Sequence, residues 1–239
     1  MKKIIIIIAM LILVSINAYA EEPTPEQILQ KVADIGSTII DMKANIIDKT
    51  TAKIDGKPDQ ITGPNNRIYY QKKPSKVKVE NPVDNSFYII TADKMYLKEA
   101  GADLVETPNS ESMNNQIDYI NNLSKFLELN TVTTENQFVE GSIQYYALKV
   151  VPTTEPKPYS KIILTINYTQ GIVSKMELYN LGDELVLTNE VQQYEIIDSI
   201  PIPVKTKETK LFADATVTTE VQYSNIILNQ GIDDAIFTP

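Results

Sequence analysis

Hydrophobic and polar residues alternate along most of the chain. In residues 76–80 two valines alternate with charged side chains, and in residues 94–98 Met95 and Leu97 alternate with polar neighbours. In residues 217–223 two valines and a tyrosine share a face with a threonine. A period of two with one polar face is typical of antiparallel strands that are solvated on one side.

A short amphipathic helix is predicted over residues 24–36. Thr24 is a suitable N-cap, Pro25 suits the first helical position, and Gln27 completes a capping box. The following positions place four apolar side chains on one face: Ile28, Leu29, Val32 and Ile35. We expect Gly36 to end this helix in a left-handed conformation.

A second helical pattern lies between Pro108 and Leu129. Its apolar positions recur at helical spacing: Met113, Ile117, Ile120, Leu123 and Leu127. The opposite face is polar, so the pattern favours a helix that covers an apolar surface. The same periodicity also fits an ordinary helix that packs on the core.

Short turns separate the strands and set the order of elements. Turns are predicted at residues 169–171, 181–183 and 213–214, and the proline-rich residues 152–158 are expected to form a long hairpin loop. These signals predict roughly ten to twelve strands. The order is helix, strands, helix, strands, which favours a mainly β (α+β) fold with an open antiparallel sheet covered on one face by helices.

The first twenty residues have the layout of a secretory signal. Two lysines precede an unbroken apolar run from Ile4 to Val14, and small residues stand at Ala18 and Ala20. This pattern predicts a signal peptide over residues 1–20 that is cleaved after Ala20, and it favours cleavage over a membrane anchor. The remainder, residues 21–239, is expected to form a single domain.

Charge narrows the classes of partner. The formal net charge is −9, which argues against nucleic acid as a partner and against broad adsorption to anionic membranes. Arg67 is the one arginine, which argues against bidentate phosphate clamps. Residues 69–80 nevertheless hold four lysines, a cluster that suits either a patch for an anionic partner or a solvated corner between strands.

Catalytic chemistry is sharply limited by what the chain lacks. The sequence has no histidine and no cysteine, which excludes Ser-His-Asp and Cys-His arrangements and metal sites built on imidazole or thiolate. Paired carboxylates could still support glycoside hydrolysis, but nothing singles out a pair, and the chain has no tryptophan for sugar stacking. We therefore expect no enzymatic activity, no cofactor and no metal.

Tyrosine is the dominant aromatic residue, with 13 copies. A phenol combines a broad apolar ring with one polar tip, which suits the lining of a cavity for an amphipathic ligand. Core packing uses the same residues, and composition does not separate the two.

Several segments, taken in order, resemble the LolA-like family of periplasmic lipoprotein carriers, the outer-membrane lipoprotein-sorting proteins. The segments that carry this resemblance are ILQKVADI, STIIDMKANIIDKTTAKIDG, NRIYYQKKP, SKVKVENP, FYIITADKMYLKE and the closing QYSNIILNQGIDDAIFTP. Each motif alone is weak, and their order and spacing over most of residues 24–239 make the case.

The departures from the family pattern point to a divergent member. The arginine of the family's Lys-Arg-Pro signature, which helps to hold the helical lid over the cavity, falls on Lys73. Lysine cannot make the same forked hydrogen bonds, so Lys73 is only a candidate lid latch. The family's cavity tryptophans are absent, and residues 200–220 add a hairpin relative to the simplest carriers.

The resemblance implies an open, incomplete antiparallel β-barrel whose concave face is closed by helices over a cavity for acyl chains. It implies a soluble, monomeric periplasmic chaperone that carries lipoproteins or lipids in outer-membrane biogenesis, with an inner-membrane donor complex and an outer-membrane acceptor as candidate partners. A periplasmic module that senses lipids or lipoproteins, or a structural protein of the envelope, are the alternatives. The expected cavity lining is Tyr69, Val77, Val79, Met95 and Leu97 on the sheet and Ile117, Ile120 and Leu127 on the lid, and plain core packing is the alternative for each.

Overall fold

The structure is a computed structural model that describes residues 22–109 and 122–239. Its elements are α2 (Pro25–Ser37), β1 (Asp41–Ile54), β2 (Gln60–Lys72), β3 (Lys76–Glu80), β4 (Phe87–Ile90), β5 (Lys94–Lys98), β6 (Val105–Pro108), α4 (Leu123–Leu129), β7 (Asn130–Glu140), β8 (Ile143–Pro152), β9 (Lys161–Asn167), β10 (Ile172–Tyr179), β11 (Leu185–Ile197), β12 (Ile200–Leu211), β13 (Ala215–Leu228) and the 3₁₀ helix η1 (Asp234–Phe237). The predicted signal peptide, residues 1–20, and most of the second helical pattern, including Ile117 and Ile120, lie outside the described residues. Of that pattern, the structure describes α4.

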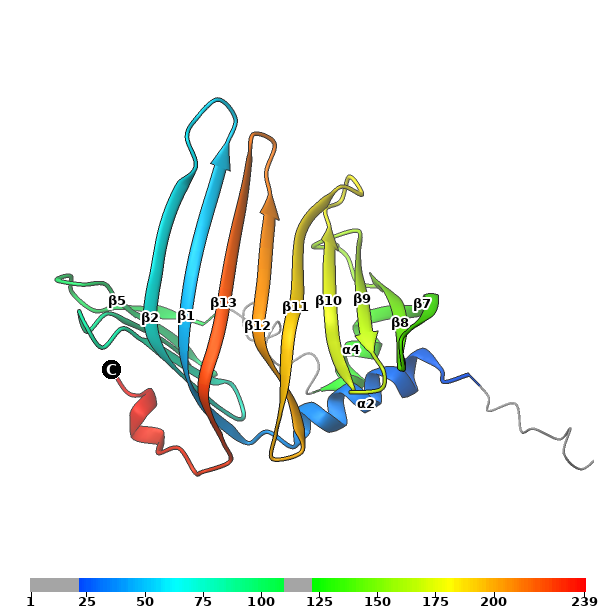
Figure 1. Ribbon diagram of the computed structural model, residues 1–239, viewed down its shortest axis with the longest axis horizontal. Coiled ribbons are helices and arrows are strands. Elements are labelled where there is room, and N and C mark those ends of the chain that lie inside the picture. Colours follow the sequence, from blue (N-terminus) through cyan, green and yellow to red (C-terminus); the bar gives the residue numbers. More distant parts are fainter. Residues whose placement is uncertain (1–21, 110–121) are drawn as a thin grey trace, which may run out of the picture.

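The strands form one antiparallel sheet. In the described residues it has 13 strands, one more than the upper expectation, in the order β6-β5-β4-β3-β2-β1-β13-β12-β11-β10-β9-β8-β7. Two meanders therefore meet where β1 pairs with β13, and Ile46 lies opposite Tyr223 there. Figure 1 shows the long strands β2, β1, β13, β12 and β11 side by side, with the two ends of the sheet bending away from the viewer. The prediction of a mainly β fold with an open antiparallel sheet is confirmed.

The predicted connections between strands are also confirmed. Residues 169–171 join β9 to β10, residues 181–183 lie before β11, and residues 213–214 join β12 to β13. The proline-rich residues 152–158 lead from β8 into β9, and these two strands pair antiparallel as a hairpin. The hairpin expected as an addition occupies the middle of the sheet, because β13 pairs with β1.

Helix α2 begins as predicted and ends differently. Thr24 is its N-cap, and the capping box with Gln27 is present. The left-handed ending at Gly36 is wrong, because the helix continues through Ser37 and its C-cap, Thr38, has a φ of −71°. The hydroxyl groups of Ser37 and Thr38 donate to the carbonyls of Asp34 and Ile35, which satisfies two of the last carbonyls without a left-handed residue.

One face of the sheet, which we call the inner face, packs against α2. Ile28, Leu29 and Val32 of the helix form a buried cluster with Leu148 and Ile166 of β8 and β9. Leu127 of α4 packs against the same cluster, and Figure 1 shows both helices near the β7–β10 end of the sheet. Helices thus cover this end of the inner face, as expected.

The turn between β9 and β10 comes close to α2. Gly171 has a φ of +68°, and a Cβ added there would lie 2.9 Å from Cγ1 of Ile35. Both the left-handed backbone and this close approach require glycine at the turn.

The opposite face, which we call the outer face, is covered near β2–β5 by the C-terminal segment, residues 229–239. Phe237 is buried with Tyr70 and Ile89, and Figure 1 shows the C-terminus beside β2. Here a prediction is wrong: Lys76 and Lys78 are not a fully solvated face. The Lys78 side chain is only 16% exposed and forms an ion pair with Glu80. Nζ of Lys76 lies 3.0 Å from Oδ1 of Asp234 in the C-terminal segment.

Charges of alternating sign cross the middle of the outer face. Opposite pairs follow one another over five adjacent strands, in the order Lys175, Glu190, Lys207, Glu220 and Lys49. Opposite charges on neighbouring strands stabilise a sheet by about 0.2–1 kcal/mol per pair, and a slip of one residue would break the series. This series therefore helps to fix the register of β1 and β10–β13.

Candidate ligand-binding face

The five residues predicted on the sheet side share the inner face. The register aligns them in two rows across β2, β3, β4 and β5, which read Tyr69–Val79–Tyr88–Leu97 and Gln71–Val77–Ile90–Met95. Paired residues on adjacent strands point to the same side of a sheet. The structure therefore brings Tyr69, Val77, Val79, Met95 and Leu97 together on one surface.

Exposure increases along this surface toward the edge of the sheet. Val77 and Val79 are buried, whereas Leu97 is 40% exposed and Val105 of β6 is 51% exposed. Large aliphatic side chains at the β5–β6 edge are thus partly exposed to solvent. They lie on the inner face, which α2 covers at the opposite end of the sheet. Such a partly open apolar face is a candidate surface for an apolar ligand.

The predicted lid residue in the described chain lies elsewhere on the inner face. Leu127 packs at the β8–β9 end with the α2 cluster, while the sheet residues above lie on β2–β5. Ile117 and Ile120 lie outside the described residues. The structure therefore does not bring Leu127 into the group formed by the sheet residues.

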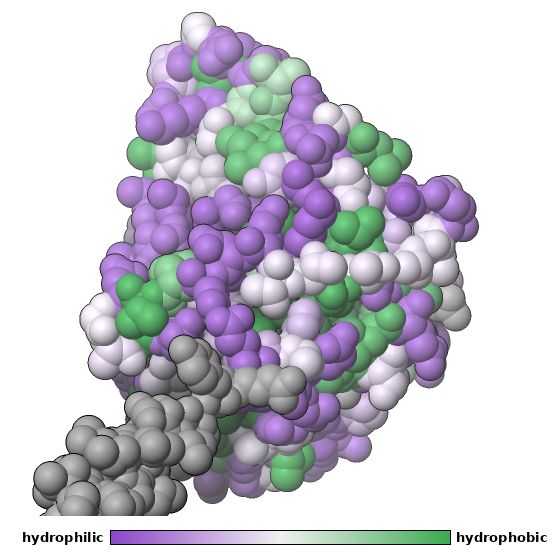
Figure 2. Space-filling model, turned by 90° about the vertical axis from the view of Figure 1, so that its right-hand side faces the viewer, coloured by the Kyte–Doolittle hydropathy of each residue, from purple (hydrophilic) through white to green (hydrophobic). Residues whose placement is uncertain are grey.

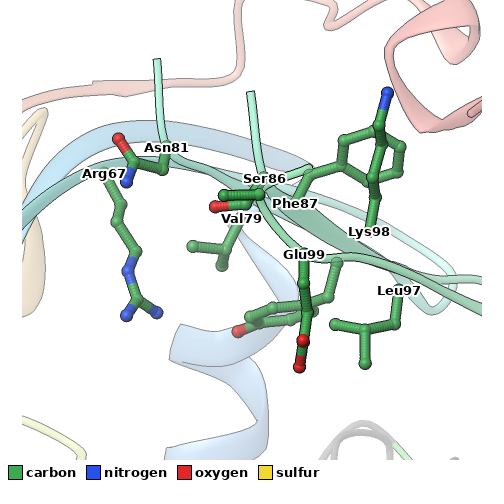
Figure 3. A pocket seen from close by; sticks show the side chains of 10 residues that line it. Arg67, Val79, Asn81, Ser86, Phe87, Leu97, Lys98 and Glu99 are labelled. Atoms are coloured by element: carbon green, nitrogen blue, oxygen red, sulfur yellow. The ribbon is translucent and has the colours of Figure 1, made fainter. Parts of the chain in front are cut away.

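A pocket of about 200 Å³ opens on the inner face beside these rows. Its lining includes the apolar or aromatic residues Val79, Tyr88 and Leu97 and the polar residues Arg67, Asn81, Ser86 and Glu99. Figure 3 shows the side chains of Arg67, Glu99 and Leu97 extending to the same side of the strands, and that of Lys98 pointing the opposite way. The volume is below the roughly 300–1,000 Å³ of ligand pockets, so a long chain would have to continue along the face.

The sequence did not predict that Arg67 lies at this candidate site. Its Nε lies 3.2 Å from Oδ1 of Asp48 on the neighbouring strand, and the side-chain amide of Asn65 donates to Oδ2 of Asp48 at 3.0 Å. Arg67 also lines a second pocket, of about 260 Å³, formed by residues of β1, β2 and β13 and by Pro82. Its being the one arginine in the chain was visible from the sequence, but its position on the inner face was not.

Three tyrosines stand around this site. The rings of Tyr69 and Tyr223 meet edge to face with centroids 6.1 Å apart, and the Tyr69 hydroxyl donates to Oε1 of Gln71. Burial raises the pKa of Tyr69, Tyr88 and Tyr223 above the ordinary tyrosine value. All three phenols therefore stay neutral near pH 7 and present apolar rings with a hydrogen-bonding tip.

Lys73 connects the corner between β2 and β3 to α2. Its Nζ donates to the carbonyl of Gly36 in the last turn of the helix at 2.7 Å, and its backbone N–H donates to the carbonyl of Ile40. A cation suits this place because the C-terminal end of a helix carries partial negative charge. Pro74 lies at the corner between the two strands.

Other surfaces of the described chain give less indication of a site. Figure 2 views the β7 and α2 end of the molecule, where hydrophobic side chains form patches interrupted by hydrophilic ones. Within residues 22–109 and 122–239, no three Asp or Glu side chains gather as metal ligands would. In the same ranges no helix has the length and hydrophobicity needed to cross a membrane.

The open, curved antiparallel sheet with helices on its inner face is a LolA-like fold, as comparison with solved structures shows. The chain is similar in structure to a LolA superfamily protein of Nitrosomonas europaea, with 16% identity, a TM-score of 0.62, and 91% of this chain and 98% of that chain covered. It is also similar to a putative outer membrane lipoprotein-sorting protein domain of Vibrio parahaemolyticus, with 15% identity, a TM-score of 0.62 and coverages of 87% and 95%. A DUF1329 family protein of Desulfovibrio piger gives 15% identity, a TM-score of 0.66 and coverages of 88% and 95%.

The resemblance inferred from the order of the motifs is thereby confirmed at the level of the fold. A family model described as "Uncharacterized protein" matches residues 104–239, more than half of the chain, and the protein belongs to that family. The chain has no match among curated proteins.

Proposed function

We propose that the protein is a non-enzymatic carrier that shields the acyl chains of lipids or lipoproteins on the inner face of its sheet. The observation that carries this proposal is the shared apolar surface of β2–β5, which buries Val77 and Val79 but leaves Leu97 at the edge partly open. The likeness to a putative lipoprotein-sorting domain supports the same type of function. The predicted signal peptide supports a place in the periplasm, between an inner-membrane donor and an outer-membrane acceptor.

A carrier of this kind has a clear physical purpose. Hiding a sixteen-carbon chain from water is worth on the order of 12 kcal/mol, at about 0.8 kcal/mol per CH₂ group. An acylated molecule therefore leaves a membrane very slowly unless a protein offers an alternative apolar surface. A shallow, partly open face offers such a surface and still allows release at the acceptor.

The direct test is binding and transfer of a dansyl-labelled fatty acid. Leu97→Glu places a charge on the partly open part of the face, where the protein can tolerate it, and we expect affinity to fall by about tenfold or more because a charge next to an acyl chain is costly. Val83→Glu is the matched control, since Val83 is 84% exposed in the loop between β3 and β4. We expect the control to bind as the wild type does.

Transfer between vesicles separates a carrier from a sensor or a structural protein. A carrier accelerates the movement of the labelled fatty acid from donor to acceptor vesicles, and Leu97→Glu should abolish the acceleration. Binding without transfer would favour the sensing role. If the wild type binds no labelled acid and lipid is absent from organic extracts of the purified protein, the carrier proposal is wrong.

A further inference from the structure

The pocket of Figure 3 has both apolar and polar residues in its lining. Val79, Tyr88 and Leu97 come from the apolar rows, whereas Arg67, Asn81, Ser86 and Glu99 lie where β2, β3, β4 and β5 leave those rows. The polar character continues across the inner face of β1 and β13, where the hydroxyl groups of Thr50 and Thr219 are 3.1 Å apart. An amphipathic molecule that lies with its chain on the apolar rows would therefore place its headgroup beside Arg67.

Arg67 has hydrogen-bonding capacity left for such a headgroup. Its contact with Asp48 runs through Nε, and among the described residues its two terminal nitrogens make no hydrogen bond. Oδ1 of Asp48 is buried and likewise has no hydrogen-bond partner in the described chain, because the 3.2 Å approach of Nε lacks hydrogen-bond geometry. Buried polar groups are nearly always satisfied, but Oδ1 is an acceptor and needs a donor such as water, so the capacity to bind an anion lies on the guanidinium nitrogens alone.

The charges around Arg67 set the strength of the site. Asp48 offsets part of the guanidinium charge from one side, and the exposed Glu99 lies at the rim of the pocket. The terminal nitrogens can still donate two parallel hydrogen bonds to a carboxylate or phosphate, the geometry for which arginine is suited. Partial neutralisation makes the contact weaker than that of an isolated arginine, which fits a ligand that must be released.

We propose that the preferred ligands of the carrier are acyl compounds with an acidic headgroup, a carboxylate or a phosphate, which Arg67 binds. This inference rests on the proposed carrier function and specifies its substrate class. Asp48 acts as a positioning residue that holds the guanidinium on the inner face and limits its affinity for anions.

The experiment measures displacement of the neutral fluorescent probe N-phenyl-naphthylamine by three ligands with the same chain: dodecanoate, dodecyl phosphate and dodecanol. The wild type should bind the two anions more tightly than the alcohol. Arg67→Gln should weaken binding of the anions by about tenfold or more, because it removes charge-assisted hydrogen bonds to the headgroup, and should leave the alcohol unchanged. Comparison of the two anions shows whether the site prefers a carboxylate or a phosphate.

Two further variants separate the role of Arg67 from damage to the fold. Lys57→Gln removes an equal charge from the exposed turn between β1 and β2, outside the lining of the pocket, and it should leave all three affinities unchanged. Asp48→Asn removes the competing carboxylate, so binding of both anions should become tighter, which a damaged fold would not produce. The double variant Asp48→Asn with Arg67→Gln removes both members of the ion pair and should lose the preference for the anions over the alcohol.

Each outcome decides the inference. Equal binding of dodecanol and dodecanoate by the wild type would refute the acidic headgroup while leaving the carrier function intact. The same loss in Lys57→Gln as in Arg67→Gln would reduce the effect to net charge and also refute it. Failure of all three ligands to displace the bound probe would instead refute the carrier function, and the inference with it.

Discussion

Lys73 is expected to hold the end of α2 against the sheet, and replacing it tests whether this contact is a latch. Lys73→Leu removes the hydrogen bond from Nζ to the Gly36 carbonyl, which is 2.7 Å long and partly buried. A hydrogen bond to a charged group contributes about 1.5–3 kcal/mol to stability, and a cation at a helix C-terminus contributes about 0.3–1 kcal/mol. Both contributions are electrostatic and overlap, so they are not added. Allowing for solvent screening, we expect a loss of about 2 kcal/mol in the free energy of unfolding.

Thermal unfolding followed by circular dichroism measures this loss. One kcal/mol shifts the melting temperature by about 2–4 °C in a protein of this size, so Lys73→Leu should melt about 4–8 °C lower. Lys73→Arg should lie near the wild type, because a guanidinium can donate to the same carbonyl. Lys57→Leu is the control, since Lys57 is exposed in the turn between β1 and β2 and its removal should have little effect.

Release of a dansyl-labelled fatty acid distinguishes a latch from a stabilising cap. If α2 must shift when the ligand enters or leaves, Lys73→Leu should change the rates of both steps, and Lys73→Arg should restore them. A lower melting temperature with unchanged rates would limit Lys73 to capping α2. Unchanged melting together with unchanged rates would refute the reasoning entirely.

The other predictions concern the core and the C-terminal segment. Leu148→Ala leaves a cavity at a fully buried position beneath α2, so the free energy of unfolding measured with denaturant should fall by about 2–5 kcal/mol. The control Leu181→Ala, at a position that is 68% exposed, should stay within about 0.5 kcal/mol of the wild type. Equal effects of the two substitutions would mean that the α2 cluster is not the core. Hydrogen bonds from Lys72 and Lys76 lower the pKa of Asp234 below its ordinary 3.8. The contribution of these ion pairs to holding the C-terminal segment should therefore be complete above pH 3.8 and be lost as the pH falls through the lowered value. Asp234→Asn should therefore increase amide hydrogen exchange in residues 232–238 at neutral pH. The control Asp214→Asn, in the exposed turn between β12 and β13, should not increase it. Equal exchange in the wild type and both variants would contradict the role of these ion pairs.

Local pattern was enough to predict many elements of this fold. The capping box at Thr24, the alternation in residues 76–80 and 94–98, and the turns between the later strands depend on neighbours within a few residues, and the structure agrees with each. The ending of α2 was predicted wrongly because two chemical solutions compete there. A left-handed glycine would satisfy the last carbonyls, but the hydroxyl groups of Ser37 and Thr38 do so instead.

The alternation of polar and apolar residues did not reveal what covers the outer face of the sheet. Period two separates two faces of a strand but does not say what lies against either face. Lys76 and Lys78 therefore read as solvated, although residues 229–239 return over this part of the sheet and bring Asp234 to Lys76. That contact joins residues more than a hundred and fifty positions apart and leaves no mark on the local pattern.

The sequence by itself determined the strands, the first helix and the apolar residues of β2, β3 and β5, because these follow from side-chain periodicity and short-range hydrogen bonds. Only the tertiary structure decided that β13 pairs with β1, that these apolar residues share the face on which α2 packs, and that Arg67 and Asp48 meet on that face. The physical reason is that register across a sheet depends on pairs of distant strands. One alternating strand can present either face to the core until its partners fix which one is covered.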